Sequence, residues 1–143
     1  INNLMKHLSY FRIFEYDERE LQRLAFDSRI EARTDAARHT RNPRLLHKLA
    51  DDWSARVLFA VAQNPVAPAS ALIEIAKQPF VSCLIQVGQH PNTPESLLED
   101  LATHTESGVR AAVARNPKAS FHVLDKLAND PNFDVSQSAK ENP

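Results

Sequence analysis

The chain of 143 residues is 43% hydrophobic and 24% charged, and its 17 Lys and Arg against 18 Asp and Glu give a net charge of −1. These fractions are typical of a soluble globular protein, and no apolar run approaches the ~18 residues that a membrane span needs. The charge balance also lacks the basic excess of a dedicated nucleic-acid-binding protein, although a local basic patch is compatible with it. We therefore expect no membrane segment, and we favour a partner other than nucleic acid.

Residues 1–16 precede the repeat register that fills the rest of the chain. Leu4, Leu8 and Phe11 lie at helical spacing there, which predicts one apolar stripe. Two interpretations are open: an N-terminal capping helix, or the second half of a preceding, partial repeat. Because the sequence begins at Ile1 without an initiator methionine or a signal-peptide pattern, we expect a fragment of a longer protein.

A sequence unit recurs about every 26 residues from there to the last residue, which indicates an array of stacked units. Two apolar columns define the unit, and an alanine follows the second column every time. The predicted units span approximately 17–40, 41–65, 66–91, 92–117 and 118–143. The first column contains Leu21, Leu46, Leu72, Leu98 and Leu124, and the second contains Leu24, Leu49, Ile75, Leu101 and Leu127.

The first helix of each unit has a start signal. Asp17, with Glu20 three residues later, can satisfy the first amide groups of its helix reciprocally. Asn42-Pro43 starts the next helix, because the leucine columns keep their step only when His39-Thr40 ends the first unit. Proline suits the first helical position. The later units start at Ala67-Pro68, Thr93-Pro94 and Ala119-Ser120.

The second half of each unit predicts a shorter helix, as in residues 109–116. Val109, Ala112 and Val113 share one face, and the same positions elsewhere are mostly small or β-branched, which lets successive units approach closely. In four of the five units a proline follows the Asn or His at the end of this helix and terminates the helix. With two glycines and no alternating apolar pattern, the chain contains no predicted β-sheet. We predict an all-α solenoid of about five repeats, each an α-helix followed by a short helix.

The segment 93–117 reads Thr-Pro-Glu-x-Leu-Leu-x-x-Leu-Ala and then x-Val-Arg-x-x-Val-Ala-x-Asn-Pro, and it resembles the leucine-rich repeat variant family of bacterial proteins. The resemblance covers about residues 17–143 and is loosest at 17–40. It implies a right-handed superhelix in which α-helices alternate with short 3₁₀ helices. The founding type of the family also carries an iron–sulfur cluster on cysteines before the repeats. This chain departs from that type, because it has one cysteine and a cluster normally takes four thiolates, so any cluster would lie upstream of Ile1.

The cysteine and the histidines have structural interpretations. Cys83 shares a column with three valines, which predicts a small core residue, and a single cysteine fits a reducing compartment, so we expect the cytoplasm. His104 falls in a corner column that otherwise contains Asp and Gln. His39 and His90 fall in a column with three asparagines, Asn64, Asn116 and Asn142, which predicts a ladder of side chains bonded to corner backbone.

No motif in the sequence supports catalysis. There is no His-Glu-x-x-His, no spaced Cys/His pair of a zinc site, no Gly-x-Ser-x-Gly and no glycine-rich phosphate loop. Carboxylates such as Glu99 and Asp100 are best interpreted as a solvated helix face. We therefore predict a protein that is not an enzyme, with no catalytic residue, no metal and no cofactor.

One departure from the repeat is a candidate interaction site. In the second helix of each unit, the two residues after the first core position should face outward. They are polar or small in three units but large and apolar in the two middle ones, and exposed apolar patches mark interaction sites. The alternative is that these helices are inner ones, covered on both sides. The candidate surface comprises Leu58, Phe59, Leu84 and Ile85, with Trp53 extending it or filling its own corner, and with Arg33 and Arg110 on its flanks.

These observations predict a non-catalytic protein-interaction or scaffold module whose partner is a protein or a second copy of the chain. Stacked repeats offer long continuous faces, although a fold does not by itself fix a function. One alternative is the repeat domain of a larger iron–sulfur protein whose cluster lies outside this chain. Another is nucleic-acid binding through arginines gathered on one face, namely Arg33, Arg38, Arg56, Arg110 and Arg115.

Overall fold

The computed structural model describes residues 16–143, so the helix predicted for residues 1–16 lies outside the described residues except for Tyr16. The described part contains ten α-helices and no β-strand. None of these helices combines the length and the apolar character that crossing a bilayer requires. The helices are α2 (Glu18–Ala25), α3 (Ile30–His39), α4 (Pro43–Leu49), α5 (Ala55–Gln63), α6 (Ala69–Ala76), α7 (Val81–Gln89), α8 (Glu95–Leu101), α9 (Ser107–Arg115), α10 (Phe121–Leu127) and α11 (Phe133–Glu141).

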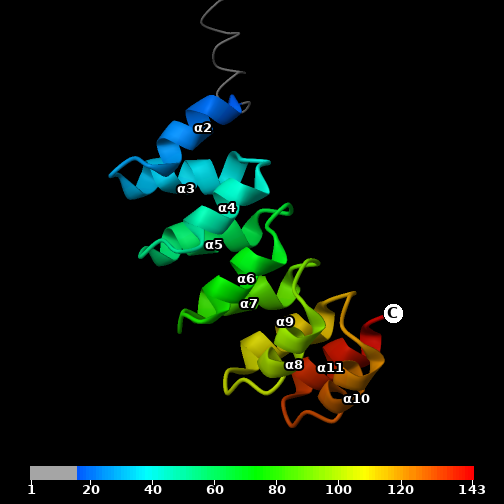
Figure 1. Cartoon of the computed structure of the whole chain (residues 1–143). Coiled ribbons are helices and arrows are strands. Elements are labelled where there is room, and N and C mark those ends of the chain that lie inside the picture. Colours follow the sequence, from blue (N-terminus) through cyan, green and yellow to red (C-terminus); the bar gives the residue numbers. More distant parts are fainter. Residues whose placement is uncertain (1–15) are drawn as a thin grey trace, which may run out of the picture.

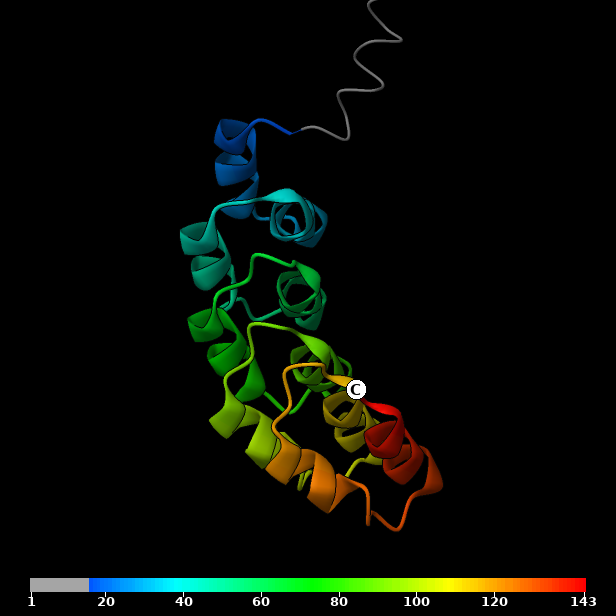
Figure 2. The same ribbon diagram turned by 90° about the vertical axis from the view of Figure 1, so that its right-hand side faces the viewer.

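The helices follow one another as five pairs, each an even-numbered helix and the odd-numbered helix after it (Figure 1). Figure 2 shows two layers in a curved stack, with the even-numbered helices on the convex side and the odd-numbered helices on the concave side. Each odd-numbered helix contacts the next odd-numbered one. An odd-numbered helix in the middle of the stack is therefore covered by its own pair and by neighbours on two sides.

Side-chain caps start several of the even-numbered helices, although the reciprocal bond predicted from Glu20 at the start of α2 does not form within the described residues. The side chain of Asp17 accepts a hydrogen bond from the amide of Arg19, and that of Asn42 accepts one from the amide of Arg44, with Pro43 in the first turn. Pro68 and Pro94 differ from the prediction, because each occupies the N-cap itself, with an extended backbone (ψ 159° and 151°). The fixed φ of proline suits this position as well, since no amide proton is needed there.

The second helix of each pair is longer than the first, which corrects the prediction of a short or 3₁₀ helix. The odd-numbered helices are α-helical over nine or ten residues, against seven or eight for the even-numbered ones. Their small and β-branched residues carry only a modest helix penalty. Most helical stability in proteins comes from packing, and neighbours on two sides supply more of it here.

The predicted leucine columns form the core between the two layers. Leu46, Leu72 and Leu98 are completely buried, whereas Leu124 in the last pair stays partly exposed. The second column is likewise buried from α4 onward, with Ile75 at 0% exposure. The inside of the first helix was therefore predicted correctly in the three middle units, whereas Leu24 in the first unit and Leu124 in the last are partly exposed.

Close contact between odd-numbered helices requires a small residue at Gly88. A Cβ atom added at Gly88 would lie 3.0 Å from the Cβ of Ala112 on the next odd-numbered helix. That separation is shorter than ordinary van der Waals contact between carbons. The small residues that the sequence places on α7 and α9 thus set how closely these helices stack.

Candidate interaction surface

A ladder of side chains fixes the register of the pairs at one corner. From α5 onward, the C-cap residue of each odd-numbered helix donates a hydrogen bond from its side chain to the backbone carbonyl of the C-cap residue one pair earlier. This confirms the predicted structural role of the His and Asn column from the second pair onward. The bonds run from Asn64 Nδ2 to Thr40 O (2.8 Å), from His90 Nε2 to Asn64 O (2.7 Å), from Asn116 Nδ2 to His90 O (3.0 Å) and from Asn142 Nδ2 to Asn116 O (2.9 Å).

In the first pair, the ladder position is occupied by Thr40, whereas the sequence predicted His39 there. Thr40 is the C-cap of α3, and its hydroxyl donates to Glu18 Oε2 at 2.8 Å. The ring of His39 packs against that of Tyr16, with 5.1 Å between the ring centroids. The physical reason is the length of α3, which has ten residues where the other odd-numbered helices have nine.

His90 and His104, which lie in corner columns, both bond backbone groups. The amide of Asn92 donates to Nδ1 of His90 at 3.0 Å, so Nε2 carries the proton that bonds the next carbonyl. Nδ1 of His104 accepts from the amide of Glu106 at 3.0 Å. In the corners of their own pairs, the carboxylates of Asp27, Asp52 and Asp130 accept the equivalent hydrogen bond from the backbone amides of Arg29, Ser54 and Asn132, respectively.

Two arginines, Arg33, which is buried, and Arg110, which is partly buried, connect neighbouring pairs at the opposite corner. Arg33 bonds both carboxylate oxygens of Asp52 (Nε to Oδ2 at 2.7 Å, Nη2 to Oδ1 at 3.3 Å), and its side chain is only 9% exposed. Arg110 bonds Asp130 in the same way, at 2.8 and 3.2 Å. Each Nη1 also donates to two carbonyls of its own corner. These hydrogen bonds hold the pKa of Asp130 below its usual value and raise the pKa of Arg110.

The predicted exposed patch is wrong at two of its four apolar positions. Leu58 and Leu84 are 1% and 5% exposed, because they occupy the same interior positions as Arg33 and Arg110. Phe59 is partly buried, and so is Ile85, whose Cδ1 would lie 3.4 Å from a Cβ added at Gly108. The alternative interpretation, inner helices covered on both sides, agrees with this burial.

A pairing rule across units explains why leucine replaces arginine at these positions. Wherever this column contains arginine, the corner of the next pair supplies a buried aspartate. After Leu58 the corresponding corner residue is Gln78, and after Leu84 it is His104. An arginine buried without a carboxylate would be costly, so leucine fills the position where no partner is available. Arg33 and Arg110 are therefore structural residues and do not flank an exposed patch of Leu58 and Leu84.

Trp53 lies on a different part of the molecule. It is 74% exposed at a corner, and its ring lies 5.4 Å from the guanidinium carbon of Arg33. Phe26 at the adjacent corner is 62% exposed, with Nζ of Lys48 4.1 Å from its ring centroid. Together they line a depression of about 400 Å³ that does not include Phe59. Trp53 therefore extends no patch with the middle helices.

Phe59 lies in a second depression, which spans the three neighbouring helices α3, α5 and α7 on the concave side. This depression has a volume of about 370 Å³. Its apolar part comes from Phe59 and two alanines, and two exposed arginines, Arg38 and Arg56, lie at its margin. We call it the α5 depression. It is lined by Thr34, Arg38, Ala55, Arg56, Phe59, Ala60, Gln63 and Ser82.

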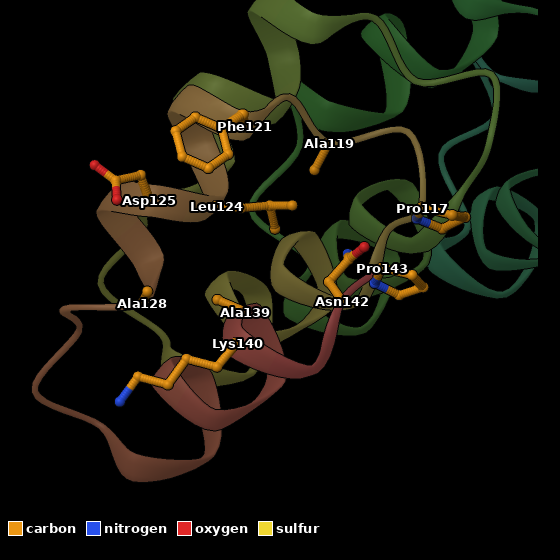
Figure 3. Close-up of a pocket in the computed structure, with 10 residues that line it drawn as sticks. All are labelled: Pro117, Ala119, Phe121, Leu124, Asp125, Ala128, Ala139, Lys140, Asn142 and Pro143. Carbon is orange, nitrogen blue, oxygen red and sulfur yellow. The ribbon is translucent and has the colours of Figure 1, made fainter.

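A third depression lies at the end of the stack, where α10 and α11 form the last pair (Figure 3). Its volume is about 460 Å³, and Leu124, Ala128 and Ala139 contribute its apolar part. The leucines equivalent to Leu124 in the three preceding pairs are buried beneath a following pair. The end depression thus has the composition of the interface between pairs.

Cys83 has a structural environment, and the described segment contains no cluster of metal-binding side chains. The Cys83 thiol is buried, donates to the carbonyl of Ala55 at 3.5 Å, and has a raised pKa because burial disfavours the thiolate. Within residues 16–143, no three His, Cys, Asp or Glu side chains gather as a metal ion would need. No family model matches the chain, and neither the curated proteins nor the solved structures compared with it include a match. The α5 depression is the candidate functional site because it combines concavity, apolar surface and charge.

Proposed function

We propose that the chain is a right-handed solenoid of five repeats similar to the bacterial leucine-rich repeat variants. The regular succession of five helix pairs supports the repeat assignment. The side-chain ladder supports it independently, because its rungs from Asn64 to Asn142 are each 26 residues apart. Handedness and family membership rest on the resemblance in sequence.

We propose further that this solenoid is a cytoplasmic protein-interaction module without catalytic activity. The observation that carries this proposal is the α5 depression, a hollow with an apolar part and a charged margin that is lined by residues of α3, α5 and α7. These helices lie on the concave side of the stack (Figure 2). Binding sites are concave and mostly apolar, with a few polar groups that fix orientation. The α5 depression is concave and has mixed composition, with three apolar residues, of which Phe59 is the largest, and five polar or charged ones. The other occupant to test is a second copy of the chain.

The alternatives receive less support from the contacts. For nucleic-acid binding, Arg33 and Arg110 are engaged with buried carboxylates, and Arg115 bonds Asp134 at 2.9 Å. Of the five arginines predicted for nucleic-acid binding, only Arg38 and Arg56 line the α5 depression, whereas a phosphate backbone is bound by many cationic side chains. For catalysis, the corner histidines and the cysteine have structural contacts that account for them.

The test is selection of peptides from a random display library on purified 1–143 protein, followed by calorimetric titration of the selected peptides. Ser82 is exposed at the margin of the α5 depression, so Ser82→Trp should fill it without disturbing the core. We expect that variant to reduce affinity at least about tenfold, a change of roughly 1.4 kcal/mol. Ser96→Trp, at an exposed position of α8, is the matched control and should bind like the parent.

Two outcomes would contradict the proposal. In the first, no peptide binds with an affinity above background, and sedimentation shows a monomer at all concentrations. In the second, peptides bind equally well to both tryptophan variants, which would locate binding away from the α5 depression.

A further inference from the structure

The margin of the α5 depression carries two arginines where the same junction elsewhere in the stack carries an ion pair. Between α9 and α11, Arg115 Nη2 lies 3.0 and 2.9 Å from the two carboxylate oxygens of Asp134. Between α3 and α5, the two equivalent positions are occupied by Arg38 and Arg56. Like charges replace opposite charges at this junction.

The equivalence of the two junctions follows from the helices themselves. Arg38 lies five residues after Arg33, and Arg115 lies five residues after Arg110, on helices that the two buried ion pairs hold in the same way. On the facing helices, Arg56 is the second residue of α5 (Ala55–Gln63), just as the aspartate is the second residue of α11 (Phe133–Glu141). The two positions between α3 and α5 thus match those that hold an arginine–carboxylate pair between α9 and α11, but here both are occupied by arginine.

The carboxylates that the protein provides nearby interact only weakly with these arginines. Arg38 contacts Asp35 at 3.5 Å, and Arg56 contacts Glu31 at 3.6 Å. These side chains are between 40% and 70% exposed, and exposed ion pairs of this kind contribute little. Both guanidinium groups therefore remain accessible to an external anion at the depression's margin.

We propose that the α5 depression binds an acidic segment of a partner protein, in which one apolar side chain lies on Phe59 and flanking carboxylates bond Arg38 and Arg56. This rests on the proposed function and names the chemistry of the partner. Guanidinium groups bind carboxylates through paired hydrogen bonds, which gives orientation as well as attraction. The described residues that line the depression include two cations and no carboxylate, and an acidic ligand would displace their exposed partners Asp35 and Glu31, which lie outside the lining.

A peptide fits these features better than a nucleic acid does. The hollow offers apolar surface from Phe59 and from Ala55 and Ala60, whereas a nucleic-acid groove would present a track of cations for successive phosphates. The net charge of −1 opposes association with a polyanion that has no apolar anchor.

The experiment compares synthetic fluorescein-labelled peptides by anisotropy with the whole 1–143 protein. Each peptide selected by display is tested beside a copy in which every Glu and Asp is changed to the corresponding amide. We expect acidic residues next to an apolar one in the selected set, and at least about tenfold weaker binding of the amide copies. Affinity should also fall as salt is raised.

The decisive variant is Arg56→Asp, which recreates the ion pair seen between α9 and α11. It should leave the melting temperature unchanged or higher and reduce binding of acidic peptides at least about tenfold, because one cation is lost and an anion now occupies the other. Arg115→Gln, at the equivalent arginine outside the depression, is the matched control and should bind like the parent.

The outcomes separate the two proposals. If selected peptides bind, are blocked by Ser82→Trp, but show no acidic preference and no response to Arg56→Asp, the acidic-ligand inference is wrong and the interaction module stands. If no peptide binds, the proposed function itself fails. If labelled single-stranded oligonucleotides bind more tightly than any peptide and are released by Arg56→Asp, the ligand is a nucleic acid and the inference is overturned.

Discussion

The ion pair of Arg110 with Asp130 allows a direct test of the packing between helix pairs. Arg110→Leu removes four hydrogen bonds, two to Asp130 and two to corner carbonyls, and leaves a carboxylate buried without its cation. Breaking a fully buried pair costs ~3–5 kcal/mol. Because Asp130 keeps the bond from the amide of Asn132 and Arg110 is 16% exposed, we expect a loss of about 2–4 kcal/mol.

A second substitution should restore most of that loss. Arg110→Leu with Asp130→Gln reproduces the combination that the protein already uses at Leu58 and Gln78. Replacing a buried ion pair by groups that need no counter-charge is often close to neutral, so the double variant should lie within about 1 kcal/mol of the parent. Urea unfolding followed by far-ultraviolet circular dichroism measures both differences.

The exposed pair provides the matched control. Arg115→Leu makes the same substitution at an arginine whose pair with Asp134 is 50% and 68% exposed, so we expect a change below about 1 kcal/mol. Two results would refute the pairing rule: Arg110→Leu within about 0.5 kcal/mol of the parent, or a double variant as unstable as the single one.

Three further predictions follow from the contacts. Leu101→Ala should lower the free energy of unfolding by roughly 2–5 kcal/mol, because Leu101 is 5% exposed in the core, whereas Arg115→Ala should change it by less than about 1 kcal/mol; similar losses in urea titration would contradict this. Gly88→Ala should destabilise the protein, although alanine favours helices, because its Cβ would meet that of Ala112 at 3.0 Å; a raised melting temperature would show that the helices separate easily. The folded-state pKa of Asp130 lies below its unfolded value of ~3.9, so the stability that the ionised carboxylate contributes is present above that pH and is lost as the pH falls through the folded-state pKa. Asp130→Asn should therefore reduce the loss of unfolding free energy at acid pH. If the pH dependence of stability is unchanged in this variant, other carboxylates cause it.

Much of the fold could be predicted from the sequence because it depends on short-range chemistry. The leucine columns repeat at helical spacing within one unit, so burial of Leu72 and Leu98 could be predicted without knowing what covers them. Helix starts at Asp17 and Asn42 depend on a side chain and an amide two residues away. The ladder could be predicted from the shared chemistry of histidine and asparagine in one column.

The features that sequence analysis missed depend on contacts between units. The exposed-patch interpretation gave these helices one buried side, and the alternative covered them on both sides. Stacking covers the odd-numbered helices on two sides, so Leu58 and Leu84 are buried. The sequence does contain a correlation between two columns about 20 residues apart. Where the first column has arginine, the second has aspartate, and where the first has leucine, the second has another residue. It acquires a meaning only once Arg33 and Asp52 are seen in contact.

The candidate site shows the same division. Phe59, Arg38 and Arg56 were each singled out by residue type, but the first was assigned to an apolar patch and the arginines to a possible basic face. Only the tertiary structure places all three around one depression, because adjacent helices bring together residues that are about 20 positions apart in the chain. Sequence periodicity determined which residues are inside each unit. Stacking decided which of the remaining residues are covered and which ones share a surface.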